Sequence, residues 1–97
     1  MKAELVKNIS KDLHLSEEEV LEESISSFLD RSLCNASVEI EKLRNKYDVD
    51  SPEELEEKIE KGEVDAHPAW EELIEWENLN KQIVKFKEWM KKISTSS

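Results

Sequence analysis

The chain has 97 residues, the length of one small domain, with 39% charged residues and a formal net charge of −10. One glycine and two prolines are too few for a turn-rich β protein and are typical of long helices and coiled coils. The excess of negative charge disfavours nucleic acid as a ligand, because it would repel the phosphates.

The chain opens with a short helix and a capped turn. Its first apolar residues recur every four positions: Leu5, Ile9 and Leu13. This spacing predicts a helix over residues 3–13 that packs the stripe inward. Ser16 is followed three residues later by Glu19, the capping-box spacing in which each side chain satisfies an amide at a helix start. A second helix is therefore predicted to begin at this point.

A long helix over residues 17–47 is predicted from apolar or small residues that recur by threes and fours. They are Leu21, Ile25, Phe28, Leu29, Leu33, Ala36, Ile40, Leu43 and Tyr47. The helix would be about 45 Å long at 1.5 Å per residue, which exceeds the body of a compact domain of this size. Residues 32–37, with the sequence SLCNAS, contain serine and asparagine, whose side chains compete with the helix for backbone hydrogen bonds. If the helix is interrupted, we expect the break in this stretch.

Two further helices follow. Ser51 as N-cap, Pro52 in the first turn and Gly62 as the stop predict a short acidic helix over residues 52–61. Pro68 begins a helix predicted over residues 68–93, and residues 94–97 are expected to be a frayed tail. Apolar residues of this helix alternate by threes and fours, the pattern of a coiled-coil seam: Trp76, Leu79, Ile83, Phe86, Met90 and Ile93.

These elements predict an all-α fold in a single domain over residues 1–97. Its body is a long antiparallel hairpin of the 17–47 and 68–93 helices, with the short acidic helix bridging them and the N-terminal helix across one end. Charge varies along the chain, because residues 48–80 carry two basic and thirteen acidic residues, whereas residues 81–97 carry five and one. In an antiparallel hairpin the basic end lies near the acidic start of the first long helix.

The sequence favours a protein without catalytic, metal or cofactor chemistry. The acidic residues form runs typical of exposed helix faces, whereas catalytic carboxylates need environments that separate their pKa values. His67 and Glu71, four residues apart, fall short of a metal-ligand set. Cys34 is the sole cysteine and is interpreted as a small core residue. No secretory signal pattern or membrane-spanning apolar run is seen, which predicts a cytoplasmic protein without membrane contact.

The last helix carries a second apolar set that points away from much of the seam. It consists of Trp70, Leu73, Ile74, Val84 and Trp89. A helix that is apolar on more than one stripe needs more than one neighbour. Two interpretations remain open: the first and third helices cover this set, or it is a surface for a protein partner, because exposed tryptophans are favoured at interface hot spots.

Two stretches resemble small prokaryotic antitoxin-type proteins of toxin gene neighbourhoods. They are LVKNISKDLHLSEEEVLEESISSFLDRSL and LRNKYDVDSPEELEEKIEKGEVDAHPAWEELIEWENL, and together they cover most of the chain. The resemblance implies a non-catalytic helical protein that binds and neutralises a cognate toxin, commonly a nuclease, with a basic surface. The partner-binding residues implied by it are Trp70, Trp76, Glu71, Glu72 and Glu75, and the exposed-tryptophan argument adds Trp89.

Two alternatives are kept beside the antitoxin interpretation. One is a homo-oligomeric helical structural protein, with a homodimer as the simplest form. The other is a nucleic-acid-binding regulator that uses the helix-turn-helix-like start of the chain together with Lys85, Lys87 and Lys91.

Overall fold

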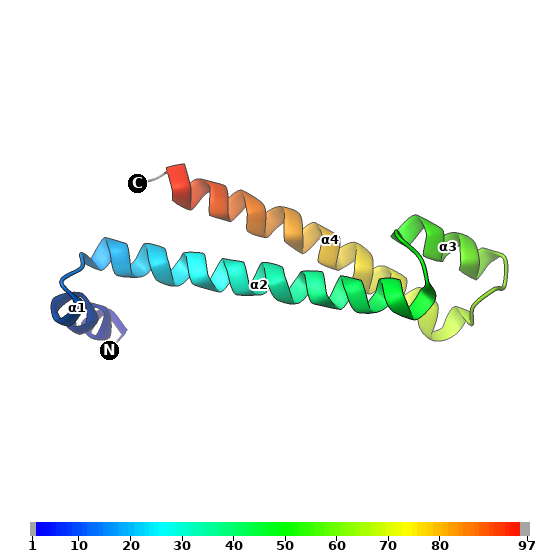
Figure 1. The fold of residues 1–97 in the computed structure, drawn as a ribbon, viewed down its shortest axis with the longest axis horizontal. Coiled ribbons are helices and arrows are strands. Elements are labelled where there is room, and N and C mark those ends of the chain that lie inside the picture. Colours follow the sequence, from blue (N-terminus) through cyan, green and yellow to red (C-terminus); the bar gives the residue numbers. More distant parts are fainter. Residues whose placement is uncertain (1, 96–97) are drawn as a thin grey trace.

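The computed structural model describes residues 2–95, which form four helices and no strand. They are α1 (Lys2–Leu13), α2 (Glu17–Tyr47), α3 (Pro52–Glu60) and α4 (Ala66–Thr95). The long helices α2 and α4 run antiparallel, and α3 lies beside the start of α4 (Figure 1). The helix α1 lies at the start of α2, at the opposite end of the molecule from α3 (Figure 1). The predicted all-α hairpin with a short bridging helix and a short N-terminal helix is thus confirmed.

Helix starts follow the predicted capping signals. Ser16 is the N-cap of α2, and its hydroxyl accepts a hydrogen bond from the amide of Glu19 at 3.0 Å. Ser51 is the N-cap of α3 and accepts from the amide of Glu54 at 3.2 Å. These bonds satisfy amides that have no partner within the helix. Local sequence therefore sets where both helices begin.

The helix α2 is continuous through residues 32–37, where a break was considered. The hydroxyl and amide side chains of this stretch make no hydrogen bond to the backbone in the described part of the chain, so the competition that interrupts helices is absent. Ala36, at 4% exposure, is buried instead. Cys34, predicted to be a core residue, is exposed, because the helix turns it away from the side on which Ala36 is buried.

The helix α4 differs from its predicted bounds at both ends. Its assigned start is Ala66, but His67 has an extended backbone (φ −111°, ψ 121°) and a cis peptide bond to Pro68, so regular helix begins at Pro68 as predicted. Its last turn includes Ser94 and Thr95, which were expected to fray. The rest of the predicted tail, residues 96–97, lies outside the described residues.

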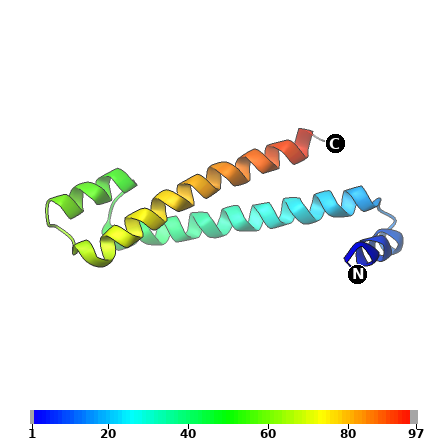
Figure 2. The same cartoon turned by 180° about the vertical axis from the view of Figure 1, so that it is seen from behind.

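The core lies at one end of the hairpin, which we call the closed end. It consists of Leu43, Tyr47, Val49, Leu55, Ile59, Ala69, Leu73 and Trp76, with Ile40, Val64 and Leu79 packed against it. The seen-from-behind view shows α3 beside the start of α4 at this end (Figure 2). Because Leu55 is fully buried, α3 belongs to the core.

The other end, the open end, departs from the predicted packing. The ribbons of α2 and α4 diverge toward it (Figures 1 and 2). Leu21, Ile25 and Phe28 of the predicted inward stripe are 47% to 60% exposed. The helix α1 buries none of its residues, and Leu5 and Leu13 of its stripe are about 60% exposed. Val20 and Leu29 stay buried at this end, but the rest of the stripe is left exposed where α2 and α4 diverge, because an apolar stripe is buried only where a neighbour packs closely on it.

The result is a rod and not a compact body. Its principal extents are 60 × 26 × 18 Å, and its radius of gyration is 19.4 Å. A compact domain of this length would have a radius of gyration of about 12.5 Å.

Candidate partner-binding surfaces

Trp70 lies near the start of α4 with 41% of its surface exposed, and Ile74, one turn further, is 56% exposed. The helix α3 packs on a different side of α4, where Ala69, Leu73 and Trp76 are buried. Of the second apolar set, the core beside α3 therefore covers Leu73 alone, and the other four members remain 41% to 56% exposed.

Carboxylates flank these two apolar residues. The Glu71 carboxylate lies 2.9 Å from Nδ1 of His67, and both side chains are mostly exposed. Glu75 lies beside Ile74 in a shallow groove on α4, and no cation within residues 2–95 forms an ion pair with it. We call Trp70, Glu71, Ile74 and Glu75 the Trp70 surface. It has an apolar centre and a negative rim, the usual arrangement of a protein interface.

Two of the predicted partner-binding residues serve the fold instead. Trp76 is 2% exposed and lies in the core. The Glu72 carboxylate, 17% exposed, accepts hydrogen bonds from the ammonium of Lys46 and, at 3.0 Å, from the hydroxyl of Tyr47. Burial and the hydrogen bond to Glu72 raise the pKa of Tyr47, and the hydrogen bond to Glu72 raises the pKa of Lys46. Neither Trp76 nor Glu72 is therefore free to contact a partner.

Trp89 lies far from the Trp70 surface, at the open end of the hairpin. It lines an apolar groove between α2 and α4, which we call the distal groove: Ile25, Phe28, Leu29, Phe86, Trp89, Lys92 and Ile93. The ammonium of Lys92 lies 4.6 Å from the centre of the Trp89 ring. Sequence reasoning named Trp89 as a partner-binding residue but missed the groove, because it assigned Phe28 and Phe86 to buried stripes. The sequence feature that could have indicated the groove is the predicted length of the 17–47 helix, about 45 Å, which exceeds the body of a compact domain of this size.

The lysines proposed for nucleic-acid binding do not share one face of α4. Lys87 and Lys91 are one turn apart, but Lys85 is rotated by about 200° from Lys87 at 100° per residue. Lys85 lies instead beside Val84 and Phe86 in a shallow apolar depression. These three lysines therefore do not form a single phosphate-binding stripe along the helix.

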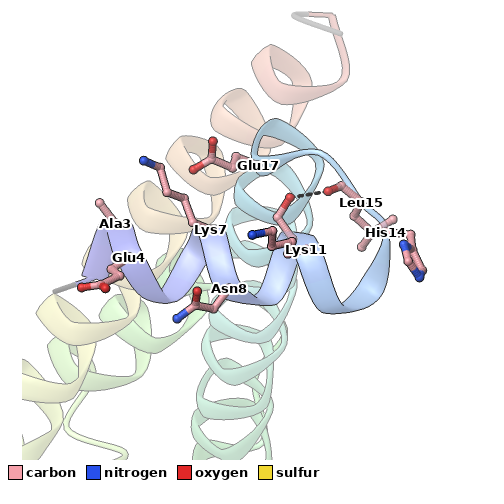
Figure 3. Close-up of a pocket in the computed structure, with 9 residues that line it drawn as sticks. Ala3, Glu4, Lys7, Asn8, Lys11, His14, Leu15 and Glu17 are labelled. Atoms are coloured by element: carbon pink, nitrogen blue, oxygen red, sulfur yellow. Dashed lines mark hydrogen bonds between the residues drawn. The ribbon is translucent and has the colours of Figure 1, made fainter.

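A further hollow lies between α1 and the start of α2. Figure 3 shows Lys7 and Lys11 of α1 there, together with Glu4 and with Glu17 of α2. The Ser10 hydroxyl donates to the carbonyl oxygen of Leu15 and holds the turn between the helices. Charges of both signs alternate around the hollow, so it favours neither an anion nor a cation.

Comparison with known proteins places the whole chain in one family. A family model described as "Uncharacterized protein MJ0235 family" matches residues 1–97. The chain belongs to this family. No curated protein and no solved structure matches it. Family membership therefore brings no activity, ligand or partner with it, and the function has to be argued from the surfaces just described.

Other features of this family member bear on the kind of site. No helix within residues 2–95 is both long and apolar enough to cross a membrane. In the same part of the chain, no group of three or more His, Cys, Asp or Glu side chains could hold a metal ion. The Trp70 surface and the distal groove expose large apolar side chains at opposite ends of the hairpin.

Proposed function

We propose that this chain is a non-catalytic helical module that binds a protein partner with a basic surface through the Trp70 surface. The observation that carries the proposal is the exposure of Trp70 and Ile74, 41% and 56%, on adjacent turns of α4. Tryptophan is highly buried on average, and at interfaces it is among the residues that contribute most binding energy.

The surrounding charge supports a basic partner. Residues 48–80 carry thirteen acidic and two basic residues, and both basic residues are engaged within the chain. Lys58 donates to the carbonyl oxygens of Tyr47 and Asp48, and Lys61 pairs with Glu57. The closed end therefore presents a negative field around an apolar centre, which speeds association with a positive surface and selects against acidic ones.

In its specific form, the proposal is an antitoxin that neutralises a toxin, with a ribonuclease as the expected class. The support is the resemblance of both halves of the chain to antitoxin-type proteins. A ribonuclease presents basic residues to its substrate phosphates, and exposed carboxylates compete for such a surface. The acidic side chains of this chain lie mostly on exposed helix faces, which favours binding over catalysis.

The test is co-expression of the chain with the product of its neighbouring gene, followed by size-exclusion chromatography and a growth assay. We expect the two proteins to co-elute and the growth defect caused by the gene product to be relieved. Trp70→Ser and Glu75→Lys should each weaken both effects. Val84→Ser is the matched control. Val84 is an apolar residue of α4 that is 56% exposed, as Ile74 is, but it lies outside the Trp70 surface.

The outcomes separate the two levels of the proposal. If the wild-type chain neither co-elutes with the gene product nor changes its toxicity, the antitoxin proposal is wrong. If the complex forms but tolerates Trp70→Ser and Glu75→Lys as well as it tolerates Val84→Ser, the partner binds elsewhere and the assignment of the Trp70 surface is wrong. Circular dichroism of each variant shows whether the helices are intact.

A further inference from the structure

The chain exposes more surface than a compact monomer of its mass. Its accessible surface is 7374 Å², about 1600 Å² more than the roughly 5800 Å² expected for a compact monomer of 11.4 kDa. A protein interface of standard size covers about 800 Å² on each partner. The excess is therefore large enough for a full interface on every copy of the chain.

The excess includes apolar surface gathered at the open end. Phe28 of α2 is 60% exposed and Trp89 of α4 is 53% exposed, and both line the distal groove. Leu21 and Ile25 continue the exposed stripe along α2. The apolar stripe of α1 lies at the same end of the molecule (Figure 1). Apolar side chains that cluster in this way are a mark of an interaction surface.

The charges beside the groove are opposite on its two walls. At 100° per residue, Glu18 and Glu22 lie on the side of α2 that carries Ile25, and Lys85 and Lys92 lie on the side of α4 that carries Trp89. A two-fold axis along the groove would set α2 of one copy against α4 of the other. Each acidic wall would then meet a basic wall, twice in the same dimer. A surface that carries both signs in this arrangement is complementary to itself, as an isologous interface requires.

We propose that a second copy of this chain covers the distal groove, with the groove of each copy facing that of the other around a two-fold axis. The contact buries Phe28 and Trp89 and sets the acidic start of α2 against the basic end of α4 of the second copy. It lies at the opposite end of the hairpin from the Trp70 surface and does not depend on the proposed function.

The first experiment is the mass of the purified full-length chain in solution, measured by light scattering over a range of concentrations. We expect twice the 11.4 kDa of one chain, falling toward the monomer on dilution. Phe28→Gln should shift the protein to monomer, whereas Val38→Gln should not. Val38 is the matched control, because it is 47% exposed on the same helix but outside the groove. Cys34→Ser in every variant removes disulfide-linked dimers, since Cys34 is exposed.

The second experiment tests the two-fold arrangement with a charge swap. One variant carries Glu18→Lys and Glu22→Lys, and the other carries Lys85→Glu and Lys92→Glu. Each variant alone would face like charges and should self-associate at least about tenfold more weakly than the wild-type chain. An equal mixture should restore a dimer that contains one copy of each, because both of its contacts again join opposite charges.

Each outcome decides one part of the proposal. A wild-type chain that stays monomeric at every concentration overturns it, and so does a dimer that Phe28→Gln leaves intact. If the charge variants form no mixed dimer while each stays helical by circular dichroism, the two-fold arrangement is wrong. Trp70→Ser should leave the dimer unchanged, so failure of this proposal and failure of the partner-binding proposal can be told apart.

Discussion

The hydroxyl of Tyr47 in α2 donates a hydrogen bond to the carboxylate of Glu72 in α4 across 3.0 Å, and the ammonium of Lys46 donates to the same oxygen. This pairing joins the two long helices at the edge of the core, where Tyr47 is 9% exposed. It is a polar contact between segments 25 residues apart in the sequence, and it fixes one carboxylate that would otherwise be part of the acidic surface.

The first prediction is that the hairpin loses stability at alkaline pH. The pKa values of Tyr47 and Lys46 are raised above their ordinary values of 10.0 and 10.5 in the folded chain, so folding tightens the binding of both protons. Their contribution is fully present below the ordinary values and is lost as the pH rises through the raised ones. Urea unfolding monitored by circular dichroism at increasing pH should show this decline.

Tyr47→Phe is the control for this decline. It removes the donor to Glu72 and should cost about 0.5–1.5 kcal/mol of unfolding free energy at neutral pH. When the pH is raised from neutral to values above 10.0, the ordinary pKa of tyrosine, the unfolding free energy of this variant should fall by less than that of the wild-type chain. An alkaline decline of equal size in both proteins would show that Tyr47 is not its source.

The second prediction concerns two tryptophans of α4 that the structure separates. Trp76→Ala should reduce the unfolding free energy by about 3–5 kcal/mol, because it empties a core position that is 2% exposed. Trp70→Ala should cost much less, because the side chain is 41% exposed and lies outside the core. Urea denaturation of both variants measures the difference. A large loss for Trp70→Ala would mean that the residue is covered within the chain.

The third prediction concerns the stop signal after α3. Gly62 has a φ of +72°, and a Cβ atom added to it would meet no other atom within 4 Å. The cost of Gly62→Ala is therefore conformational, and we expect a loss of about 1 kcal/mol, with a smaller loss for Gly62→Asn. Thermal melts of the two variants give the comparison. Equal losses would point to a cause other than the left-handed backbone.

Much of the helical architecture is predictable because it is encoded locally. The N-caps Ser16 and Ser51 and the stop at Gly62 act on neighbouring backbone groups, so their effect can be read without knowing the rest of the fold. Continuity of α2 through residues 32–37 could not be read in this way. It depends on whether the polar side chains of that stretch bond to the backbone and on the burial of Ala36.

The candidate surfaces were less predictable than the helices. Trp70 and Trp76 are six residues apart and about 120° apart around α4 at 100° per residue, so the sequence indicates that they face different directions. It does not indicate which direction has a neighbour. Phe28 was wrongly assigned to the buried stripe for the same reason, since periodicity identifies an apolar face without showing how closely a partner helix packs on it.

The fourth prediction is that the two ends of the hairpin differ in local stability. At the closed end, Leu55 is fully buried and Leu43 is 6% exposed, so amides in this region should exchange with solvent mainly through global unfolding. In a dilute monomer, the start of α2 around Leu21 has few buried neighbours and should exchange through local opening at a much lower free energy. Hydrogen exchange followed by mass spectrometry resolves the two regions. Raising the protein concentration should protect the open end selectively if the second copy covers it, whereas Phe28→Gln should remove that protection and leave exchange at the closed end unchanged.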